Sequence, residues 1–408
     1  MKIAKALEKL GIDAIDVSSA GYDTYNYWLE PVSFEPGWRK YMAKAVKDAV
    51  KIPVIAANLI RSPEQAEQQL EEGTQDFVSL GRPHIADPDW AKKAENNETI
   101  RRCICCLNCI ESMQNNAYIG GHGECAVNPF VGHEAQPIVK NGAGKKVVVV
   151  GAGAAGLTAA YVLALRGFSV TVLEKDATPG GQLKLAATPP HKAKIGWFIE
   201  DITALCEENG VEIKYSVTAD EETIAEYKPY AVFLAMGSEP LKPYFGGKYT
   251  YEDLLTFKDI LTGAVVLENK KAAVIGSGMT GLETAEFLNE KGCKTVVIEM
   301  ADTPAPGTWM QHLDDILPRL KEKGTEILTG ERLCEVYKDS VVTRNVKTGN
   351  MKKIDVDAVV LSLGSSPDTA LYEKLKGKYQ RLYQLGDEAK VGRIQNATAS
   401  AYKAAVSL

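Results

Sequence analysis

An α/β fold built mainly from parallel sheets is predicted for this chain by three features of its sequence. Apolar strand patterns alternate with amphipathic helix patterns over the first 98 residues. A glycine-rich turn lies between an apolar strand and a helix near residue 151, and the same arrangement returns near residue 276. A chain of 408 residues is also too long for one compact domain, so two to four domains are expected.

The composition excludes several classes of protein. Hydrophobic residues at 45% and charged residues at 25% are ordinary globular values. The net charge of −6, with no basic run, argues against nucleic acid as a partner. No apolar stretch approaches the roughly 20 residues that span a bilayer. The amphipathic start of the chain lacks the apolar core of a signal peptide, so we expect a cytoplasmic protein with no membrane partner.

The first 98 residues read as three strand–helix units after an initial helix. Strands are predicted at 12–19, 52–58 and 76–81, and helices at 3–11, 38–50, 63–73 and 86–96, with Asp87 and Pro88 opening the last helix. Apolar strands separated by helices indicate parallel βα units. Three such strands are too few for a closed barrel of eight.

Five of the eight cysteines lie within residues 99–143, a segment of different character. In a cytosolic chain such a cluster indicates metal or redox chemistry rather than structural disulfides. Four thiolates at short spacings suit an iron–sulfur cluster or structural zinc, and the residues alone favour neither. His122 and His133 lie nearby and are read as plain loop residues. The candidate ligands are Cys103, Cys106, Cys109 and Cys125.

The first glycine-rich turn carries the G-x-G-x-x-G spacing at Gly151, Gly153 and Gly156. The first glycine permits a tight turn, the second lets the backbone approach a diphosphate, and the third lets helix and strand pack closely. The diphosphate would lie at the helix N-terminus, where free N–H groups favour negative charge. Glu174 ends the next strand, where its carboxylate can accept hydrogen bonds from an adenosine ribose.

The second turn repeats this spacing at Gly276, Gly278 and Gly281, and Glu299 ends the following strand. Glu299 would bond the ribose 2′-hydroxyl and repel a 2′-phosphate. No arginine follows it in the sequence EMADTPAPG, so NADH is favoured over NADPH. The alternative is a degenerate repeat that binds nothing. Because residues 357–364 mirror residues 230–237, we interpret the second unit as inserted into the first.

Two dinucleotide folds in this order resemble the two-domain flavoprotein disulfide reductases, in which FAD comes first and NAD(P)H is inserted. The resemblance covers residues 145–408 and includes GGQL at 180–183, AMG at 235–237 and LGD at 385–387. It places Gln182 and Gly237 near the flavin, and Gly386 and Asp387 near its ribityl or phosphate region. No C-x-x-C occurs in this region, so a dithiol relay is not expected and electrons need another acceptor.

The cysteine cluster offers such an acceptor, and with it the chain resembles a particular group. The sequences LGRPHIADPDWAKKA, RRCICCLNC and ECAVNP, next to a two-nucleotide module, are similar to the 2,4-dienoyl-CoA and 2-enoate reductases. These are flavoproteins with an old-yellow-enzyme barrel. The resemblance implies that the four candidate cysteines hold a 4Fe-4S cluster between FAD and FMN. One spacing is a residue shorter than the family's, and Cys105 is an extra candidate ligand.

The same resemblance implies part of an FMN site in the barrel region. Gly81 and Arg82 match the family's phosphate-binding pair, and arginine can grip a phosphate through two hydrogen bonds. Asn58 stands where the family has glycine, and Tyr22, Tyr25 and Tyr27 are read as packing residues. The family's barrel has eight strands and this sequence holds the last three, so the FMN site is expected to be incomplete. No catalytic residue is assigned, because the family's proton donor lies mostly outside these strands.

The sequence therefore predicts a partial barrel at 1–98, a cysteine-rich linker at 99–143, an FAD domain at 144–262 and 356–408, and an NAD(P)H domain at 263–355. Its predicted function is electron transfer from NADH to FAD, the cluster and FMN, and then to an activated C=C bond of an unsaturated acid, enone or acyl-CoA. Two alternatives stay open: an NADH:acceptor reductase subunit, and an inactive fragment. A homo-oligomer or a complementing barrel fragment is the expected protein partner.

Overall fold

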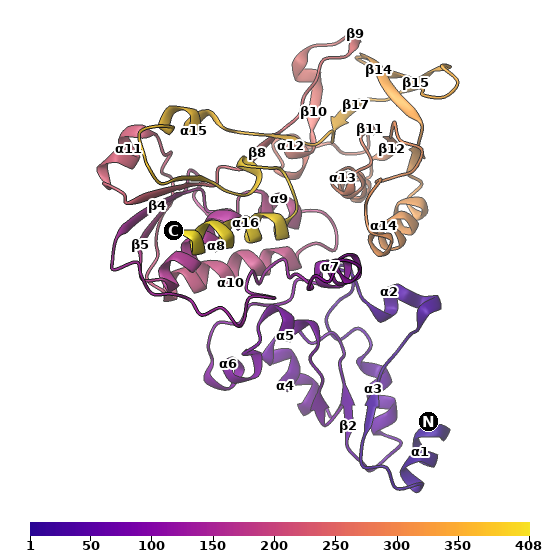
Figure 1. The fold of residues 1–408 in the computed structure, drawn as a ribbon. Coiled ribbons are helices and arrows are strands. Elements are labelled where there is room, and N and C mark those ends of the chain that lie inside the picture. Colours follow the sequence, from indigo (N-terminus) through magenta and orange to yellow (C-terminus); the bar gives the residue numbers. More distant parts are fainter. The chain divides into compact units, whose positions relative to one another are not determined.

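The computed structural model describes all residues, 1–408, and divides into two compact units (Figure 1). Unit 1 comprises Met1–Pro137 with Glu200–Leu205, and unit 2 comprises Ile138–Ile199 with Cys206–Leu408. No helix is both long enough and apolar enough to cross a membrane.

Unit 1 is built on a three-stranded parallel sheet of order β1-β2-β3. The middle strand is the most buried, with Val54 and Ala56 fully inaccessible. Helix α4 begins as its sequence predicts, because Ser62 accepts a hydrogen bond from the Gln65 amide and Pro63 occupies the first position. The elements are α1 (Lys2–Lys9), β1 (Ile15–Val17), α2 (Tyr25–Trp28), α3 (Lys40–Lys47), β2 (Val54–Ala56), α4 (Pro63–Glu71), β3 (Phe77–Val78), α5 (Arg82–Ala86), α6 (Trp90–Asn96) and α7 (Asn108–Ala117).

The start of the last predicted helix in this region is wrong. Helix α6 begins at Trp90 after Asp89, and residues 82–86 form a separate short helix, α5. Asp87 does not cap a helix: its carboxylate accepts from Lys93 Nζ at 2.6 Å and from the Arg101 amide at 3.0 Å. These bonds fix Asp87 between the two helices. Helix-start rules consider only neighbouring residues, so they do not predict the bond to Arg101, 14 positions away.

The first sheet of unit 2 is parallel, with the order β19-β7-β4-β5-β6. Its strands come from both sides of the second glycine turn, which agrees with an inserted second unit. Helix α16 packs on α8, and the Arg166 guanidinium donates to the Ala405 carbonyl between them. The elements are β4 (Lys146–Val150), α8 (Ala154–Leu165), β5 (Ser169–Leu173), α9 (Gln182–Ala187), α10 (Lys194–Glu208), β6 (Glu212–Lys214), α11 (Glu221–Glu226), β7 (Ala231–Leu234), α15 (Ala370–Leu375), β19 (Leu382–Gln384) and α16 (Ile394–Ser407).

The second sheet of unit 2 is also parallel and has the order β10-β17-β11-β12-β13. A smaller sheet, β16-β15-β14-β9, packs its apolar side chains into one core with it. Strands β8 and β18 form a separate antiparallel pair. The elements are β8 (Ser238–Pro240), β9 (Gly246–Lys248), β10 (Leu254–Thr256), α12 (Phe257–Leu261), β11 (Lys271–Ile275), α13 (Met279–Glu290), β12 (Lys294–Ile298), α14 (Met310–Glu322), β13 (Glu326–Leu328), β14 (Glu331–Tyr337), β15 (Ser340–Asn345), β16 (Met351–Asp355), β17 (Ala358–Leu361) and β18 (Ser365–Pro367).

The second sheet extends past the range 263–355 predicted for the inserted domain. Strand β17 pairs with β11 through Val359↔Ala273, and β10 pairs with the other edge of β17. Both strands lie outside the predicted range, yet their hydrogen bonds place them in the second sheet. Strand β17 occupies the position beside β11 that β7 occupies beside β4, which explains why the two sequences mirror each other.

Candidate cofactor and cluster sites

The first glycine turn has the geometry that its sequence predicts. Gly151 has a φ of +98°, a conformation that L side chains rarely adopt. A Cβ atom on Gly156 would lie 1.9 Å from the Gly151 carbonyl oxygen, so only glycine allows helix α8 to start this close to the strand. A Cβ on Gly153 would meet nothing within 4 Å. The turn therefore leaves open space at the N-terminus of α8, where the predicted diphosphate would lie.

The second turn has nearly the same geometry as the first. Gly276 has a φ of +97°, and a Cβ on Gly281 would lie 2.0 Å from the Gly276 carbonyl oxygen. A Cβ on Gly278 would meet nothing within 4 Å. Both turns thus combine one glycine required by close packing with one that borders open space.

The two acidic residues after these turns are buried and bonded to the turns themselves. Glu174 accepts from the Ala152 amide at 2.6 Å, and Glu299 accepts from the Ser277 amide at 2.9 Å. Burial works against ionisation of Glu299, but hydrogen bonds from the Ala301 and Ser277 amides hold its pKa below the ordinary value. Each carboxylate therefore stabilises its turn. Its oxygens have further lone pairs, so the predicted ribose contacts remain predictions.

Three motifs predicted to surround a flavin meet in unit 2. Gln182 Nε2 donates to Ser238 Oγ at 3.0 Å, and Ser238 Oγ donates to Asp387 Oδ2 at 3.2 Å. Gly237 has a φ of +83°, and a Cβ there would lie 3.2 Å from Gln182 Nε2. Gly386 also has a positive φ, +58°. Ser238 connects the motifs, although no sequence motif points to it.

Glu388, next to Asp387, is a buried acid that sequence reasoning missed. It is 1% exposed, and its Oε2 accepts from the Met236 amide at 2.9 Å. The other oxygen, Oε1, is buried with no hydrogen-bond partner. Burial raises the pKa of Glu388 to about 7. The folded protein therefore holds this proton more tightly than the unfolded chain does.

This shift predicts a pH-dependent stability. Between the unfolded pKa of 4.5 and the folded value of about 7, only the unfolded chain releases the proton, so the free energy of unfolding falls as the pH rises. The fall amounts to about 3 kcal/mol at 1.36 kcal/mol per pKa unit. Urea unfolding of the wild type and of Glu388→Gln at several pH values should show this component in the wild type alone. Parallel pH profiles of the two proteins would contradict the prediction.

One ion pair within unit 2 joins the segment after α9 to helix α13 and was also missed. Lys192, in the segment after α9, contacts Glu283 on α13 with an Nζ–Oε1 distance of 2.8 Å. Both side chains are largely buried, at 20% and 12% exposed. The residues are 91 positions apart, so no spacing in the sequence predicts this contact.

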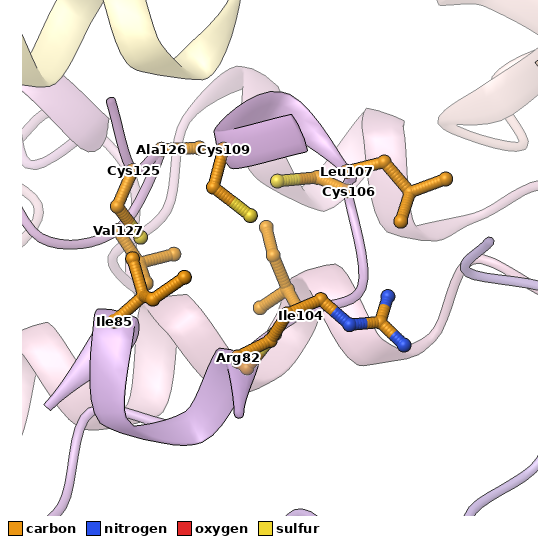
Figure 2. Close-up of a pocket in the computed structure, with 10 residues that line it drawn as sticks. Arg82, Ile85, Ile104, Cys106, Leu107, Cys109, Cys125, Ala126 and Val127 are labelled. Carbon is orange, nitrogen blue, oxygen red and sulfur yellow. The ribbon is translucent and has the colours of Figure 1, made fainter. Parts of the chain in front are cut away.

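The four predicted cluster cysteines line one cavity in unit 1 (Figure 2). The sulfur atoms of Cys106 and Cys109 point into it, and Cys109 lies in the first turn of α7. The cavity itself is small, about 10 Å³. Burial raises the pKa of Cys109 to about 11 and raises that of Cys125 as well. The other lining residues are Arg82, Ile85, Ile104, Leu107, Ala126 and Val127.

The fifth cysteine of the segment lies elsewhere. Cys105 is fully buried and packs with Val32 and Leu59 instead of lining the cavity. Its sulfur accepts a hydrogen bond from Arg61 Nε at 3.1 Å. A hydrogen bond from Cys105 lowers the pKa of Cys103, and the nearby cations Arg61 and Arg82 lower it further.

Neither histidine of the segment lines the cavity. The rings of His122 and His133 instead meet edge to face, with their centroids 5.6 Å apart. No group of three or more His, Cys, Asp or Glu side chains in the structure is arranged to hold a single metal ion.

The predicted FMN-phosphate pair is only partly available. A Cβ on Gly81 would meet nothing within 4 Å, so that side is open. Arg82, however, donates to both the carbonyl and the carboxylate of Glu30, at 2.8 and 2.6 Å. Asn58 has a φ of +33°, which suits the glycine of the family better, and its buried amide donates to Gln69 and Gln75.

The three tyrosines after β1 meet aromatic neighbours at the surface, where Tyr22 is 85% exposed. Tyr22 and Tyr25 meet Trp28 edge to face at centroid distances of 5.4 and 5.6 Å, and Tyr27 meets Phe34 at 5.5 Å.

Comparisons with known proteins agree with this architecture. Residues 145–391 match the pyridine nucleotide-disulphide oxidoreductase family, and residues 1–100 match the NADH:flavin oxidoreductase / NADH oxidase family. The chain is 39% identical to an NADH oxidase of Thermoanaerobacter brockii over 413 residues, covering 99% of this chain and 63% of the relative. It is 29% identical to a cinnamate reductase of Clostridium sporogenes, covering 100% and 61% of the two chains.

A solved structure of 2-naphthoyl-CoA reductase with 2-naphthoyl-CoA superposes on the whole chain with a TM-score of 0.91. The two sequences are 27% identical, and the match covers 62% of the solved chain. This chain therefore spans somewhat less than two thirds of the relatives that it matches. The predicted fold, a barrel-like region followed by Rossmann-like nucleotide-binding domains, is confirmed.

These matches also confirm the resemblance found in the sequence. The chain belongs to the pyridine nucleotide-disulphide oxidoreductase family and, with its NADH:flavin oxidoreductase region, has the domain combination of the 2-enoate and 2,4-dienoyl-CoA reductase group.

Proposed function

We propose that this chain transfers electrons from NADH through FAD to an iron–sulfur cluster, and that the cluster delivers them to FMN or to another acceptor. The observation that carries the proposal is the single cavity lined by Cys103, Cys106, Cys109 and Cys125. It occurs in a chain with two glycine turns, each bordered by open space. An oxidoreductase without a dithiol needs such an exit for electrons.

The residues of unit 2 fit the two nucleotides. The turn at Gly151–Gly156 and the chain Gln182–Ser238–Asp387 would hold FAD, and the turn at Gly276–Gly281 would hold NADH. FAD accepts two electrons together and releases them singly, while the protein supplies binding and orientation. The ion pair between Lys192 and Glu283 would steady the two nucleotide sites relative to each other.

The residues of unit 1 fit a four-cysteine cluster. Four thiols surround one cavity whose remaining wall is largely apolar, and cysteine thiolates are the usual ligands of a 4Fe-4S cluster. Structural zinc would also satisfy four thiolates, but zinc has no redox chemistry. Because the proposed function is electron transfer, an iron–sulfur cluster is favoured over zinc at this site.

The two candidate functions differ in the final acceptor of the electrons. Cinnamate and 2-naphthoyl-CoA, named for two relatives, support reduction of a C=C bond in an unsaturated acid or acyl-CoA. That step requires FMN, and Arg82 is held by Glu30, so we expect FMN to bind weakly to this chain. The NADH oxidase relative favours the second candidate, an NADH:acceptor reductase that feeds a diffusible acceptor or a separate protein.

The test is NADH oxidation by the protein with bound flavin, measured first with ferricyanide and then with cinnamate. Ferricyanide reduction together with HPLC detection of FAD supports the NADH-to-FAD part of the proposal. Cinnamate reduction selects the first candidate over the second. Folded protein that contains no FAD and reduces neither acceptor would reject both candidate functions and favour the alternative that the chain is inactive.

Glu299 predicts the choice of nicotinamide cofactor. Its buried carboxylate, kept ionised by the Ser277 and Ala301 amides, would repel a 2′-phosphate. NADH should reduce the flavin at least tenfold faster than NADPH, and Glu299→Gln should narrow this ratio. Stopped-flow measurement of flavin reduction gives both rates. Equal rates in the wild type would show that Glu299 does not discriminate.

A further inference from the structure

Arg61 is a buried cation beside the cysteine segment that the functions described so far do not use. It follows β2 and is 4% exposed. Its Nε donates to Cys105 Sγ at 3.1 Å and its Nη1 donates to the Ile60 carbonyl at 2.6 Å. Its Nη2 is buried and has no hydrogen-bond partner. A buried charge is costly unless a compensating charge lies near it.

The nearby buried carboxylate does not supply a direct partner for Arg61. Glu30 is 1% exposed, and its two oxygens are bonded to other arginines, Oε1 to Arg39 at 2.9 Å and Oε2 to Arg82 at 2.6 Å. Three guanidinium groups thus accompany one carboxylate in this part of unit 1. The surplus of positive charge lies next to the cysteines, and Arg82 itself lines their cavity.

The bond from Arg61 also fixes the course of the cysteine loop. Cys105 has a φ of +58°, in the left-handed region, which is unfavourable for a residue with a side chain. Such a conformation persists where the surroundings enforce it. Here Arg61 holds the Cys105 sulfur, which does not line the cavity, while the neighbouring Cys103 and Cys106 do.

We propose that Arg61 is a positioning residue for the cluster: it holds Cys105 out of the ligand set and places a positive charge that raises the cluster's reduction potential. The proposal rests on the four-thiolate cluster proposed above. A cluster gains one negative charge on reduction, and its potential depends on nearby charge and hydrogen bonding. A buried cation beside it therefore favours the reduced form.

The first test is an EPR-monitored redox titration of the reconstituted protein. Arg61→Gln should retain iron. At a given potential, its ratio of reduced to oxidised cluster should be at least tenfold lower than in the wild type. This change corresponds to a reduction potential about 59 mV lower for one electron. Arg61→Lys, which keeps the charge, and Cys105→Ala, which keeps Arg61, should retain iron and shift this ratio less than threefold. Arg344→Gln, an exposed arginine of unit 2, controls for net charge. An unchanged potential in Arg61→Gln, or loss of iron in Cys105→Ala, overturns the proposal.

The second test uses iron-free protein and so does not depend on the cluster. Mass spectrometry after timed alkylation should show Cys105 labelled at least tenfold faster in Arg61→Gln than in the wild type. Cys206, a buried cysteine of unit 2, should react at the same rate in both proteins. Unchanged labelling of Cys105 overturns the positioning role. A wild type that binds no iron rejects the cluster itself, and the labelling result still decides whether Arg61 holds Cys105.

Discussion

Cys106→Ala is expected to lower the iron bound after anaerobic reconstitution from about four atoms per chain to less than one. The Cys106 sulfur points into the cavity next to that of Cys109, from a segment fixed on both sides by buried residues (Figure 2). No further thiol is left to replace it, because Cys105 does not line the cavity and its sulfur is bonded to Arg61. Cys125→Ala should have the same effect, since its thiol lines the same cavity.

The measurement is metal analysis combined with EPR of the dithionite-reduced protein. Cys334→Ala is the matched control, because Cys334 is a free cysteine in unit 2, far along the chain from the cavity. Circular dichroism of each variant before reconstitution establishes that it folds. Zinc without iron in the wild type, or full iron content in Cys106→Ala, would contradict the cluster assignment.

The nucleotide turns could be predicted from the sequence because their determinants are local. Gly151 and Gly156 are separated by five positions, and the conflict between a Cβ on Gly156 and the Gly151 carbonyl arises within one turn. The alternation of strand and helix is equally local, so each predicted strand exists. The strands are shorter than predicted: β3 covers two residues of the range 76–81, because an apolar pattern does not specify where pairing stops.

The contacts that complete the sites could not be predicted, because they join residues distant in sequence. Arg61 and Cys105 are 44 positions apart, and Lys192 and Glu283 are 91 positions apart. The pairing of β17 with β11 also depends on the fold as a whole, so residue spacing alone does not show that β17 lies in the second sheet. The ion pair between Arg82 and Glu30 is another such contact, because these residues are 52 positions apart.

One sequence-based ambiguity has a physical resolution. The spacing of the segment 103–109 left Cys105 as a possible ligand, since nothing in a sequence tells which of two adjacent cysteines faces inward. Cys105 has a left-handed φ, is buried with Val32 and does not line the cavity that its neighbours Cys103 and Cys106 line. The choice of Cys103, Cys106, Cys109 and Cys125 as ligands is still a prediction, and iron analysis tests it.

Gly281→Ala is expected to reduce the rate of flavin reduction by NADH at least a hundredfold, about 3 kcal/mol in activation free energy, while FAD stays bound. Its Cβ would lie 2.0 Å from the Gly276 carbonyl oxygen, so helix α13 and the turn must move apart. That movement also disturbs Ser277, whose amide donates to Glu299. The FAD turn lies in another sheet and keeps its own glycines.

Gly278→Ala is the informative comparison. Its Cβ would meet nothing within 4 Å, so the fold is unaffected, and any loss of NADH binding reports crowding of the diphosphate in the open space beside α13. Stopped-flow bleaching of the flavin at several NADH concentrations separates the two variants. Gly281→Ala should lose the reaction at every concentration, whereas Gly278→Ala should recover much of its rate at high NADH. A wild-type rate in Gly281→Ala would mean that NADH does not bind at this turn, and the second nucleotide site would have to lie elsewhere.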